Sequence, residues 1–377
     1  MSAAQPPRAE VLIDLSAIRH NLGLLAARAA ESGAETMAVV KADGYGHGAV
    51  SVARAAVEAG ASWLGTASLA EALDLRDAGI TVRLLSWLDT TGVDFTPGIE
   101  NDIDLSVSSA HELARVADAA GRAGRTARVH LKIDTGLSRN GCPAYAWPEL
   151  VKAAAAEPDV EVVAIWSHLA CADEPGHPSI DMQAKRFAAA YAVARDAGLR
   201  PLRHLANSAA TLTRSDLHFD IVRPGIAVYG LNPVAQPERL RPAMTFRSSV
   251  VLTKRIEAGE SVSYGHTWTA RRDTTLALVP VGYADGVPRT LSGRMKVWLA
   301  GSRRPVVGRV CMDQLVVDCG DDEPPLGAEV VLFGTGEAGE PTATEWAETI
   351  GTIDYEIVTG MYRPRVSRRY VGEVGQR

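Results

Sequence analysis

The chain has 377 residues, of which 46% are hydrophobic and 22% charged, and its formal net charge is −6. This composition is typical of a soluble globular protein, and the length exceeds the limit of about 250 to 300 residues for one hydrophobic core, so we expect two domains. The acidic balance and scattered basic residues offer no footprint for nucleic acid or an anionic membrane. No apolar run is long enough to span a bilayer.

The cysteines predict a reducing environment. Cys142, Cys171, Cys311 and Cys319 show neither a CxxC nor a metal-ligand spacing, so we expect four free thiols and no metal site. The first nine residues are polar and carry no apolar core, unlike a secretory signal or membrane anchor. We therefore expect a cytoplasmic protein, with residues 1–10 as a flexible N-terminus leading into the first strand.

The first two thirds of the chain alternate between strand-like and helix-like segments. Ser16 is expected to cap a helix that carries Ile18, Leu22 and Leu25 on one face. Eight strand-like runs then follow, most of them separated by amphipathic stretches: 37–40, 63–66, 82–87, 103–107, 127–133, 160–167, 203–205 and 220–222.

Eight strands that alternate with helices predict an α/β fold, a (β/α)8 TIM-type barrel over residues 11–243. An open doubly wound sheet is the competing architecture. However, no GxGxxG follows the first strand, and the number of units fits a closed barrel better.

After Pro242 the pattern changes to short valine-rich runs separated by Gly, Pro or Asp turns, which predict a mainly-β domain over 244–377. A short helix at 344–350 and a final strand near 362–370 complete it. The expected strands in between are 248–256, 261–263, 275–281, 295–299, 305–310, 314–318 and 329–333.

The most informative segment is 37–48, where an apolar run ends at Lys41 and a glycine-rich turn with Tyr45 follows. A lysine shielded at a strand end loses its proton more easily than a solvated one and can act as a nucleophilic amine toward a carbonyl cofactor. Taken alone, the segment is more typical of a strand that ends in a solvated lysine, and the downstream residues favour the catalytic interpretation.

Unusual polar residues follow several of the expected strands. Because active-site groups of such barrels collect at the C-terminal ends of the strands, these residues should share one rim. Each also has an ordinary structural explanation, such as a helix cap for an Asn-Ser pair. The residues are Lys41, Lys132 with Asp134, His168, Asn207 with Ser208, and Arg223 with Gly225.

Ser208 and the Gly225-Ile226 pair follow the seventh and eighth expected strands, where barrels commonly bind phosphate. A hydroxyl and backbone N–H groups at helix starts suit a dianion. Together with a reactive lysine they predict pyridoxal 5'-phosphate as cofactor. A plain turn at 223–225 is the alternative.

Nine short motifs follow one another along the chain: AVVKADGYGHG at 38–48, HLKIDTG at 130–136, SHLA at 167–170, NSA at 207–209, VRPGI at 222–226, VSYG at 262–265, GYADG at 282–286, CMD at 311–313 and IDYE at 353–356. In these motifs and their order the chain resembles the alanine racemase family along nearly its whole length.

The resemblance implies a PLP-dependent homodimer that interconverts L-alanine and D-alanine and supplies D-alanine for peptidoglycan. It implies that Lys41 binds the cofactor and that Lys41 and Tyr264 are the two acid/base groups. It further assigns cofactor binding to Tyr45, His168, Asn207, Ser208, Arg223, Gly225, Ile226 and Tyr355, and substrate binding to Arg139, Met312 and Tyr283.

Inversion of a stereocentre through a planar carbanion requires a proton-transfer group on each face. Because a tyrosine has a pKa of about 10, Tyr264 needs cationic or hydrogen-bonding neighbours, and we expect His168 to supply them. A guanidinium at Arg223 keeps the pyridine nitrogen unprotonated and the carbanion short-lived. In the family, Tyr264, Tyr283 and Met312 come from the second subunit.

The lysine that corresponds to Lys132 can be carbamylated in relatives, which gives an anion beside Arg139. Asn140 stands where many relatives carry leucine, which leaves substrate preference between alanine and serine open. A non-catalytic PLP carrier and an amino-acid decarboxylase are the alternatives. The carrier lacks the β-domain, and the decarboxylases use an acidic partner where this chain has Arg223.

Overall fold

The computed structural model describes residues 8–235 and 239–372, so most of the expected flexible N-terminus, residues 1–7, lies outside the described part. Its contacts divide the chain into two compact units. Within the described residues, the barrel unit comprises 18–44, 48–235 and 239–240, and the sheet unit comprises 8–17, 45–47 and 241–372.

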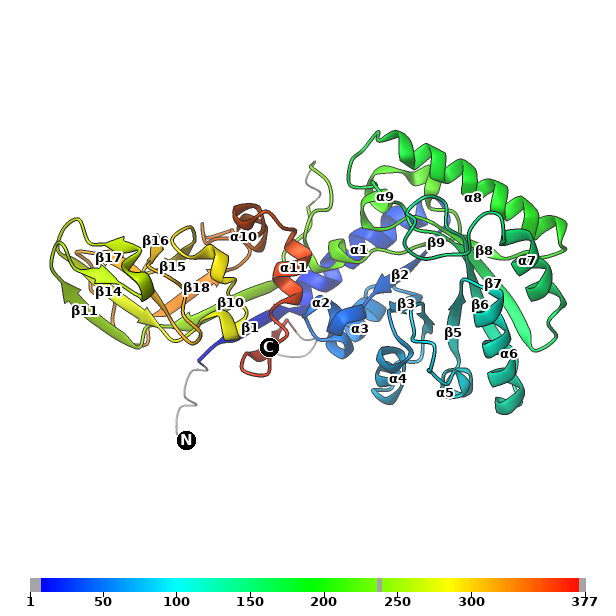
Figure 1. Cartoon of the computed structure of the whole chain (residues 1–377), viewed down its shortest axis with the longest axis horizontal. Coiled ribbons are helices and arrows are strands. Elements are labelled where there is room, and N and C mark those ends of the chain that lie inside the picture. Colours follow the sequence, from blue (N-terminus) through cyan, green and yellow to red (C-terminus); the bar gives the residue numbers. More distant parts are fainter. Residues whose placement is uncertain (1–7, 236–238, 373–377) are drawn as a thin grey trace. The chain divides into compact units, whose positions relative to one another are not determined.

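A parallel sheet of eight strands forms the centre of the barrel unit, in the order β8-β7-β6-β5-β4-β3-β2-β9 (Figure 1). Its two outer strands meet: Asp220 N donates to Arg203 O (3.1 Å) and Arg223 N donates to Ala206 O (2.9 Å). The predicted TIM-type barrel is thereby confirmed as nearly closed. The strands are β2 Glu35–Val39, β3 Trp63–Thr66, β4 Arg83–Ser86, β5 Ile103–Val107, β6 Ala127–Lys132, β7 Val160–Trp166, β8 Leu202–His204 and β9 Ile221–Val222.

Helices connect the strands and cover the outside of the barrel (Figure 1). Their ends follow ordinary capping rules: the Ser109 hydroxyl accepts from Glu112 N at the start of α6, and left-handed Gly124 ends this helix. The helical elements are α1 Leu15–Ala30, α2 Lys41–Tyr45, α3 Ala49–Glu58, α4 Leu69–Asp77, α5 Thr96–Glu100, α6 Ala110–Ala123, α7 Trp147–Ala156, α8 Pro178–Asp196, α9 Ser208–Thr213, η1 Ser215–Leu217 and η2 Ile226–Tyr229.

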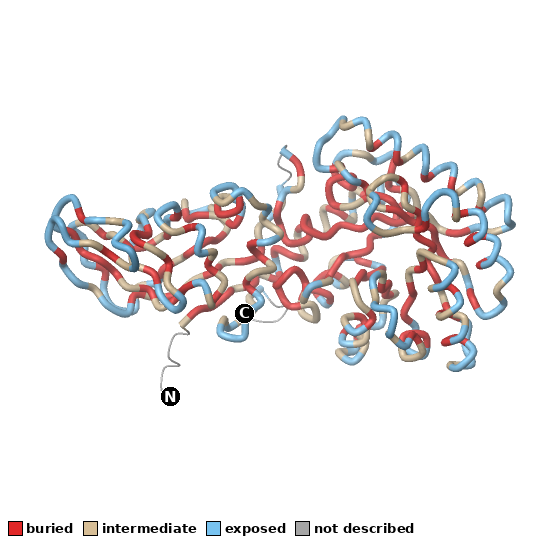
Figure 2. The backbone as a smooth tube through the Cα atoms, in the orientation of Figure 1, coloured by how far each residue is buried: buried red, intermediate tan, exposed pale blue. Residues whose placement is uncertain are grey.

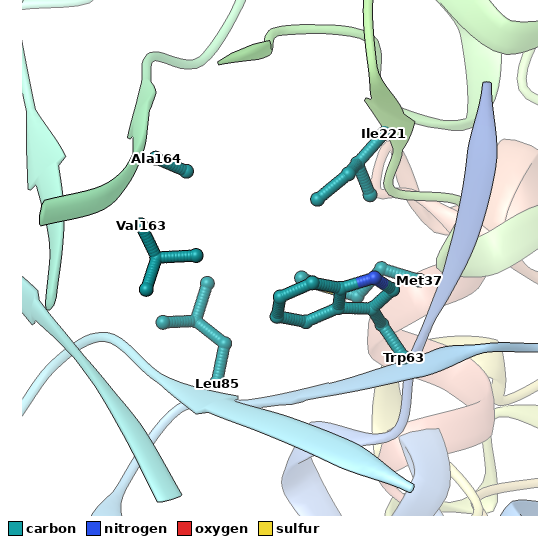
Figure 3. Packing of buried hydrophobic residues seen from close by; sticks show 6 residues of the cluster. All are labelled: Met37, Trp63, Leu85, Val163, Ala164 and Ile221. Atoms are coloured by element: carbon teal, nitrogen blue, oxygen red, sulfur yellow. The ribbon is translucent and has the colours of Figure 1, made fainter. Parts of the chain in front are cut away.

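The strands of the barrel are buried along most of their length (Figure 2). Figure 3 shows one packed cluster, to which β2, β3, β4, β7 and β9 all contribute. Because side chains fill this interior, the strand ends remain as the place for chemistry. The cluster consists of Met37, Trp63, Leu85, Val163, Ala164 and Ile221.

The sheet unit confirms the predicted mainly-β domain. Nine strands form one sheet in the order β11-β14-β17-β16-β15-β18-β10-β1-β19, and β12 and β13 form a separate pair. The strands are β1 Glu10–Asp14, β10 Met244–Ser249, β11 Leu252–Ile256, β12 Ser261–Val262, β13 Trp268–Thr269, β14 Thr274–Val279, β15 Lys296–Leu299, β16 Ser302–Val307, β17 Leu315–Gly320, β18 Glu329–Phe333 and β19 Ser367–Val371.

The first strand differs from the sequence interpretation, which assigns residues 11–243 to the barrel. Strand β1 instead pairs antiparallel with β10 and parallel with β19. Val11 and Ile13 are buried there, so β1 fills the place between two strands that come much later in the chain. Residues 11–17 therefore belong to the sheet unit, and Arg8 next to them is ion-paired with Asp285 (2.9 Å).

Two helix predictions need refinement. Helix α1 buries Ile18, Leu22 and Leu25 as expected, but its start is stabilised by Asp14. The Asp14 carboxylate accepts from Ser16 N at 2.8 Å and from the Ser16 hydroxyl at 2.6 Å. The helix begins at Leu15, two residues earlier than a cap at Ser16 would place it.

The second refinement lies near the C-terminus. The expected helix at 344–350 is α10 (Ala343–Ile350), and a further helix, α11 (Asp354–Thr359), follows it without having been predicted. Single 3-10 turns also occur at η3 Tyr264–His266, η4 Tyr283–Asp285 and η5 Arg289–Leu291. Within the described ranges, no helix has the length and apolarity needed to cross a membrane.

Candidate active site

Lys41 follows strand β2 after one intervening residue, Val40, at the start of a left-handed turn. Ala42, Asp43, Gly44 and Tyr45 all have φ between 51° and 61°. The left-handed region costs L-residues about 1 to 2 kcal/mol each, so the surrounding structure must hold this turn in place. The Asp43 side chain contributes by accepting from Ala49 N at 2.9 Å.

Glu71, which the sequence interpretation does not single out, supports the same turn. One of its carboxylate oxygens accepts from Ala42 N at 2.7 Å, and the other accepts from Ala67 N at 2.8 Å. It also completes a capping box with Ser68 at the start of α4. The Ser-x-x-Glu spacing is a recognisable signal for the cap, but not for the contact with residue 42.

The Lys41 amine lies in a positively charged surrounding. Burial and the charge of Arg139 lower its pKa, while Glu71 opposes this shift. The Nζ atom lies 6.0 Å from the centroid of the Trp87 ring. A larger share of Lys41 is therefore in the neutral, nucleophilic form than for a solvated lysine.

Lys132, the last residue of β6, is buried among other cations. Burial together with Arg223, Arg139 and Lys41 lowers its pKa to about 7, against a raising effect of Asp134. Its Nζ lies 4.1 Å from the centroid of the Trp166 ring. Neutral and protonated amine are thus both populated near neutral pH.

The loop after β6 carries Arg139, which is exposed. The Asp134 carboxylate shapes the loop by accepting from Gly136 N (2.8 Å) and Ser138 N (3.1 Å). Gly141 closes the loop with φ +129°, and a Cβ there would lie 2.6 Å from Asp134 N, so only glycine fits. Arg139 is thus presented by a loop with a defined backbone.

Arg223 follows β9 and is almost completely buried. Its guanidinium donates to the Ser167 carbonyl (2.8 Å), to His204 Nδ1 (3.1 Å) and to His168 Nδ1 (3.4 Å). Burial lowers the pKa of Arg223 to about 9, so it stays protonated at neutral pH. Burial and the charge of Arg223 hold the pKa of His168 well below its usual range.

The expected phosphate site is built around Ser208. Its hydroxyl oxygen accepts from Gly225 N at 2.8 Å and from Ala227 N at 3.3 Å, so its own proton is available to an anion. Ile226 begins the turn η2 beside it. The Asn207 side chain accepts from Ala210 N at 3.1 Å and is therefore the N-cap of α9. This is the helix-cap role that the sequence offers as the structural alternative for the Asn-Ser pair.

In the sheet unit, Tyr264 is 71% exposed. It follows Ser263, whose φ of 65° turns the chain out of the β12-β13 pair and whose hydroxyl donates to the Arg309 carbonyl (2.8 Å). Residues 263–266 line a surface depression with Cys311 and Gln314. The phenol is therefore held on a well-anchored turn at the surface of this unit.

Tyr283 and Met312 are brought together by two backbone hydrogen bonds: Tyr283 N donates to Cys311 O and Ala284 N donates to Met312 O, both at 3.0 Å. Gly282 permits this approach, because a Cβ there would lie 2.2 Å from Cys311 O. Both side chains are exposed on the sheet unit.

Tyr45 and Tyr355 also share the sheet unit, with ring centroids 6.0 Å apart. Tyr45 is buried, which raises its pKa, so it remains a neutral phenol.

The comparisons with known proteins agree with these features. The family model for the alanine racemase N-terminal domain matches residues 13–233, and that for the C-terminal domain matches 243–370. The alanine racemase of Salinispora tropica is 56% identical over 372 residues, which cover 97% of this chain and 99% of its own. The chain belongs to the alanine racemase family.

Solved structures of the alanine racemase family match over nearly the whole chain as well. The alanine racemase of Streptomyces lavendulae, a producer of D-cycloserine, is 52% identical, with a TM-score of 0.95 over 98% of this chain and 99% of its own. That of Bartonella henselae, described with covalently bound pyridoxal phosphate, is 30% identical, with a TM-score of 0.88 over 97% of this chain and all of its own.

Alanine racemases depend on pyridoxal 5'-phosphate, and the donor set of the barrel unit fits this cofactor. An aldehyde requires an amine with a lowered pKa, which Lys41 provides. A phosphate dianion requires hydroxyl and N–H donors at helix starts, which Ser208 and the start of η2 provide. An aromatic ring nitrogen requires a fixed donor, and Arg223 is a buried cation of the rim whose guanidinium is held by several hydrogen bonds.

The expectation about His168 can be made more specific. We expect His168 to be a cationic or hydrogen-bonding neighbour that favours the phenolate of Tyr264. His168 is neutral at physiological pH, because burial and the charges of Arg223, Arg139 and Lys132 lower its pKa. Its Nδ1 accepts from Arg223, which leaves the proton on Nε2. His168 can thus offer a hydrogen bond but no positive charge.

The buried histidines predict a fall in stability with acid. Burial lowers the pKa values of His130, His168 and His204 in the folded protein. Below about pH 6.5 these histidines therefore bind more protons in the unfolded chain than in the folded one. The free energy of unfolding should reach its highest value above pH 7 and should decrease as the pH falls through about 6.5, by at most about 1.4 kcal/mol for each of these histidines at pH 5.5.

Urea unfolding at pH 7.5 and pH 5.5 measures this difference. Replacement of His111, which is exposed on α6, by glutamine should leave the pH dependence as it is. Equal unfolding free energies at the two pH values would contradict the prediction.

Proposed function

We propose that this protein interconverts L-alanine and D-alanine with pyridoxal 5'-phosphate, and that D-alanine for peptidoglycan is its physiological product. The observation that carries the proposal is the convergence of Lys41, Lys132, Arg139, His168 and Arg223 on one barrel rim, in a chain that matches alanine racemases over nearly its full length. A rim with this charge suits a phosphorylated cofactor and a carboxylate substrate.

When bound, pyridoxal phosphate stabilises the negative charge that develops at Cα as its proton leaves. Lys41 would hold the cofactor's aldehyde carbon, and Arg223 would donate to its ring nitrogen. The phosphate would be held by Ser208, the backbone of Gly225 and Ile226, Tyr45 and Tyr355, with His168 and Asn207 close to the ring and phosphate. The donor chemistry described above supports these assignments.

The chain's own residues would divide proton transfer between two faces. The Lys41 amine, with its lowered pKa, takes or returns a proton on one face of Cα. The Tyr264 hydroxyl does the same on the opposite face, since a single base would return the proton to the side that it left. Arg139 and the backbone N–H of Met312 would orient the carboxylate, and Tyr283 would lie near the entrance.

A homodimer is part of this proposal. Tyr264, Tyr283 and Met312 are large side chains exposed on the surface of the sheet unit, held there by tight backbone contacts. Their exposure supports a role in a neighbouring subunit's site. A cytoplasmic location is proposed as well, since Cys142, Cys171, Cys311 and Cys319 are all free thiols, as a reducing compartment maintains them.

Lys132 is proposed to be carbamylated. A neutral amine attacks carbon dioxide to form a carbamate and releases one proton, and a pKa of about 7 makes the neutral amine abundant. The resulting anion would turn an ammonium that repels Arg139 into a partner that fixes it.

Lys132→Ala is expected to lower turnover roughly tenfold or more, because a lost charge-assisted hydrogen bond costs about 1.5 to 3 kcal/mol. Acetate or another small carboxylate should restore part of the rate by occupying the place of the carbamate. Racemisation assays with and without acetate measure the effect. A variant that is inactive and not rescued would count against the carbamate.

The test of the function is to incubate L-alanine with the purified protein and pyridoxal phosphate in deuterated water. A racemase yields both enantiomers with deuterium at Cα, an amino-acid decarboxylase yields an amine, and a non-catalytic carrier leaves the substrate unchanged. Amine formation or unchanged alanine would overturn the proposal. Relative turnover of L-alanine and L-serine in the same assay would define substrate breadth.

A further inference from the structure

A continuous line of hydrogen bonds runs through the interior of the barrel from Arg223. His204 Nδ1 accepts from Arg223 at 3.1 Å, His204 Nε2 lies 2.8 Å from His130 Nδ1, and His130 Nε2 lies 3.1 Å from Asp104 Oδ2. His204, His130 and Asp104 have no exposed surface. We call these four residues, Arg223, His204, His130 and Asp104, the interior chain.

The interior chain connects the two ends of the barrel. Arg223 follows the C-terminal end of β9, whereas Asp104 is the second residue of β5. At that end Asp104 accepts from Arg83 Nη2 at 2.7 Å and from Arg128 Nε at 2.6 Å. Both arginines stand at the beginnings of their strands, β4 and β6, so the chain ends at the rim opposite the proposed active site.

Only one arrangement of protons satisfies every link. A guanidinium can only donate, so His204 Nδ1 must accept, and its proton is on Nε2. His204 Nε2–H then donates to His130 Nδ1, which places the His130 proton on Nε2, directed at the Asp104 carboxylate. A second proton on either imidazole would set two donors against each other. Each link therefore fixes the next, from the guanidinium to the carboxylate.

Aromatic rings hold the imidazoles in this geometry. Trp166 stacks on His204 with centroids 5.5 Å apart and planes 11° apart. The Trp63 ring, shown among the packed interior side chains in Figure 3, meets His130 edge-on at 5.5 Å. The low-dielectric surroundings strengthen the hydrogen bonds and make a broken link costly.

We propose that Asp104 and His130 are positioning residues for Arg223: through His204 they fix the direction of the guanidinium's hydrogen bonds. Neither residue touches cofactor or substrate. The consequence for the reaction rests on the proposed function, whereas the tautomers of the two histidines do not depend on it. A break at His130 lets His204 move its proton to Nδ1, which then repels the guanidinium.

The first test uses the unmodified protein with ¹⁵N-labelled histidine, with and without pyridoxal phosphate. We expect the ¹⁵N spectra near neutral pH to show His204 and His130 as neutral imidazoles with the proton on Nε2, with assignments from single histidine variants. A proton on Nδ1 of either ring, or a doubly protonated ring, would overturn the proposal. This result is independent of whether the protein racemises alanine.

The second test compares three variants. His130→Phe keeps a ring against Trp63 but removes both hydrogen bonds, so the His204 tautomer should change and kcat should fall about tenfold or more, with KM altered less than about twofold. Asp104→Asn keeps an acceptor for His130 but removes the charge, so the tautomers should persist and kcat should fall less.

Thr66→Val is the matched control. It removes a buried hydroxyl that donates to the Ser68 and Leu85 carbonyls in the same barrel but lies outside the interior chain. It should leave the His204 signal and kcat unchanged. A purely structural role for His130 predicts that His130→Phe and Thr66→Val differ only in stability, and that outcome would contradict the proposal.

Discussion

Lys41→Ala should reduce the racemisation of alanine by at least about 10,000-fold, the upper range for loss of a positioned acid/base group, since the variant also loses the amine that captures the cofactor. The left-handed turn at 42–45 holds Lys41 at the rim, and burial together with the charge of Arg139 lowers the pKa of its amine. We therefore expect no other lysine of the rim to replace it. Lys132 is held against Trp166 at the end of another strand. Chiral analysis of alanine after timed incubation gives the rate.

Lys152→Ala is the matched control, because Lys152 is an exposed lysine on α7. It should retain the full rate. Absorption spectra should show that the Lys41 variant no longer retains cofactor after dialysis, while its far-ultraviolet circular dichroism stays unchanged. A Lys41→Ala protein that racemises within tenfold of the parent would refute the assignment.

Tyr264→Phe should slow inversion at Cα while leaving exchange of the Cα hydrogen in one enantiomer, two reactions that occur together in the parent protein. Loss of one acid/base group costs about 100- to 10,000-fold in rate, so inversion should fall by that factor. Lys41 still serves its own face, so one enantiomer should continue to exchange its Cα hydrogen with deuterated water while keeping its configuration. Proton NMR of the Cα signal, combined with chiral chromatography, measures both rates.

Tyr145→Phe removes a phenol that is 88% exposed in the barrel unit and should change neither rate. The decisive comparison is between exchange and inversion for the two enantiomers. Equal losses of exchange for both enantiomers in Tyr264→Phe would show that this phenol does not serve one face.

The sequence predicts much of the barrel because its signals are local. The expected strands at 63–66 and 103–107 coincide with β3 and β5, because short, mostly buried segments with few polar residues are typical of parallel strands. The rim residues are predictable for the same reason. Lys41, Lys132 and Arg223 each lie at the end of a strand or within two residues of it, and the architecture then brings strand ends together.

Features that depend on distant contacts are missed. Strand β1 has five residues, and nothing in residues 10–14 indicates that its partners lie more than 200 positions away. Glu71 is visible as a helix cap, but its bond to Ala42 N requires the fold. Likewise, His130 and Asp104 read as isolated polar residues in apolar strands, and only closure of the barrel aligns them with His204.

The pairing of β1 with β19 bears on the order in which the protein can assemble during synthesis. Residues 18–240 leave the ribosome as one block, so the barrel unit can fold while translation continues. The sheet unit contains both β1 and β19, which lie far apart in the sequence. During synthesis, the edge of β1 that pairs with β19 therefore has no partner strand until residues 367–371 have been made. A chain that terminates before Ser367 would carry that open edge permanently, as a template for aggregation.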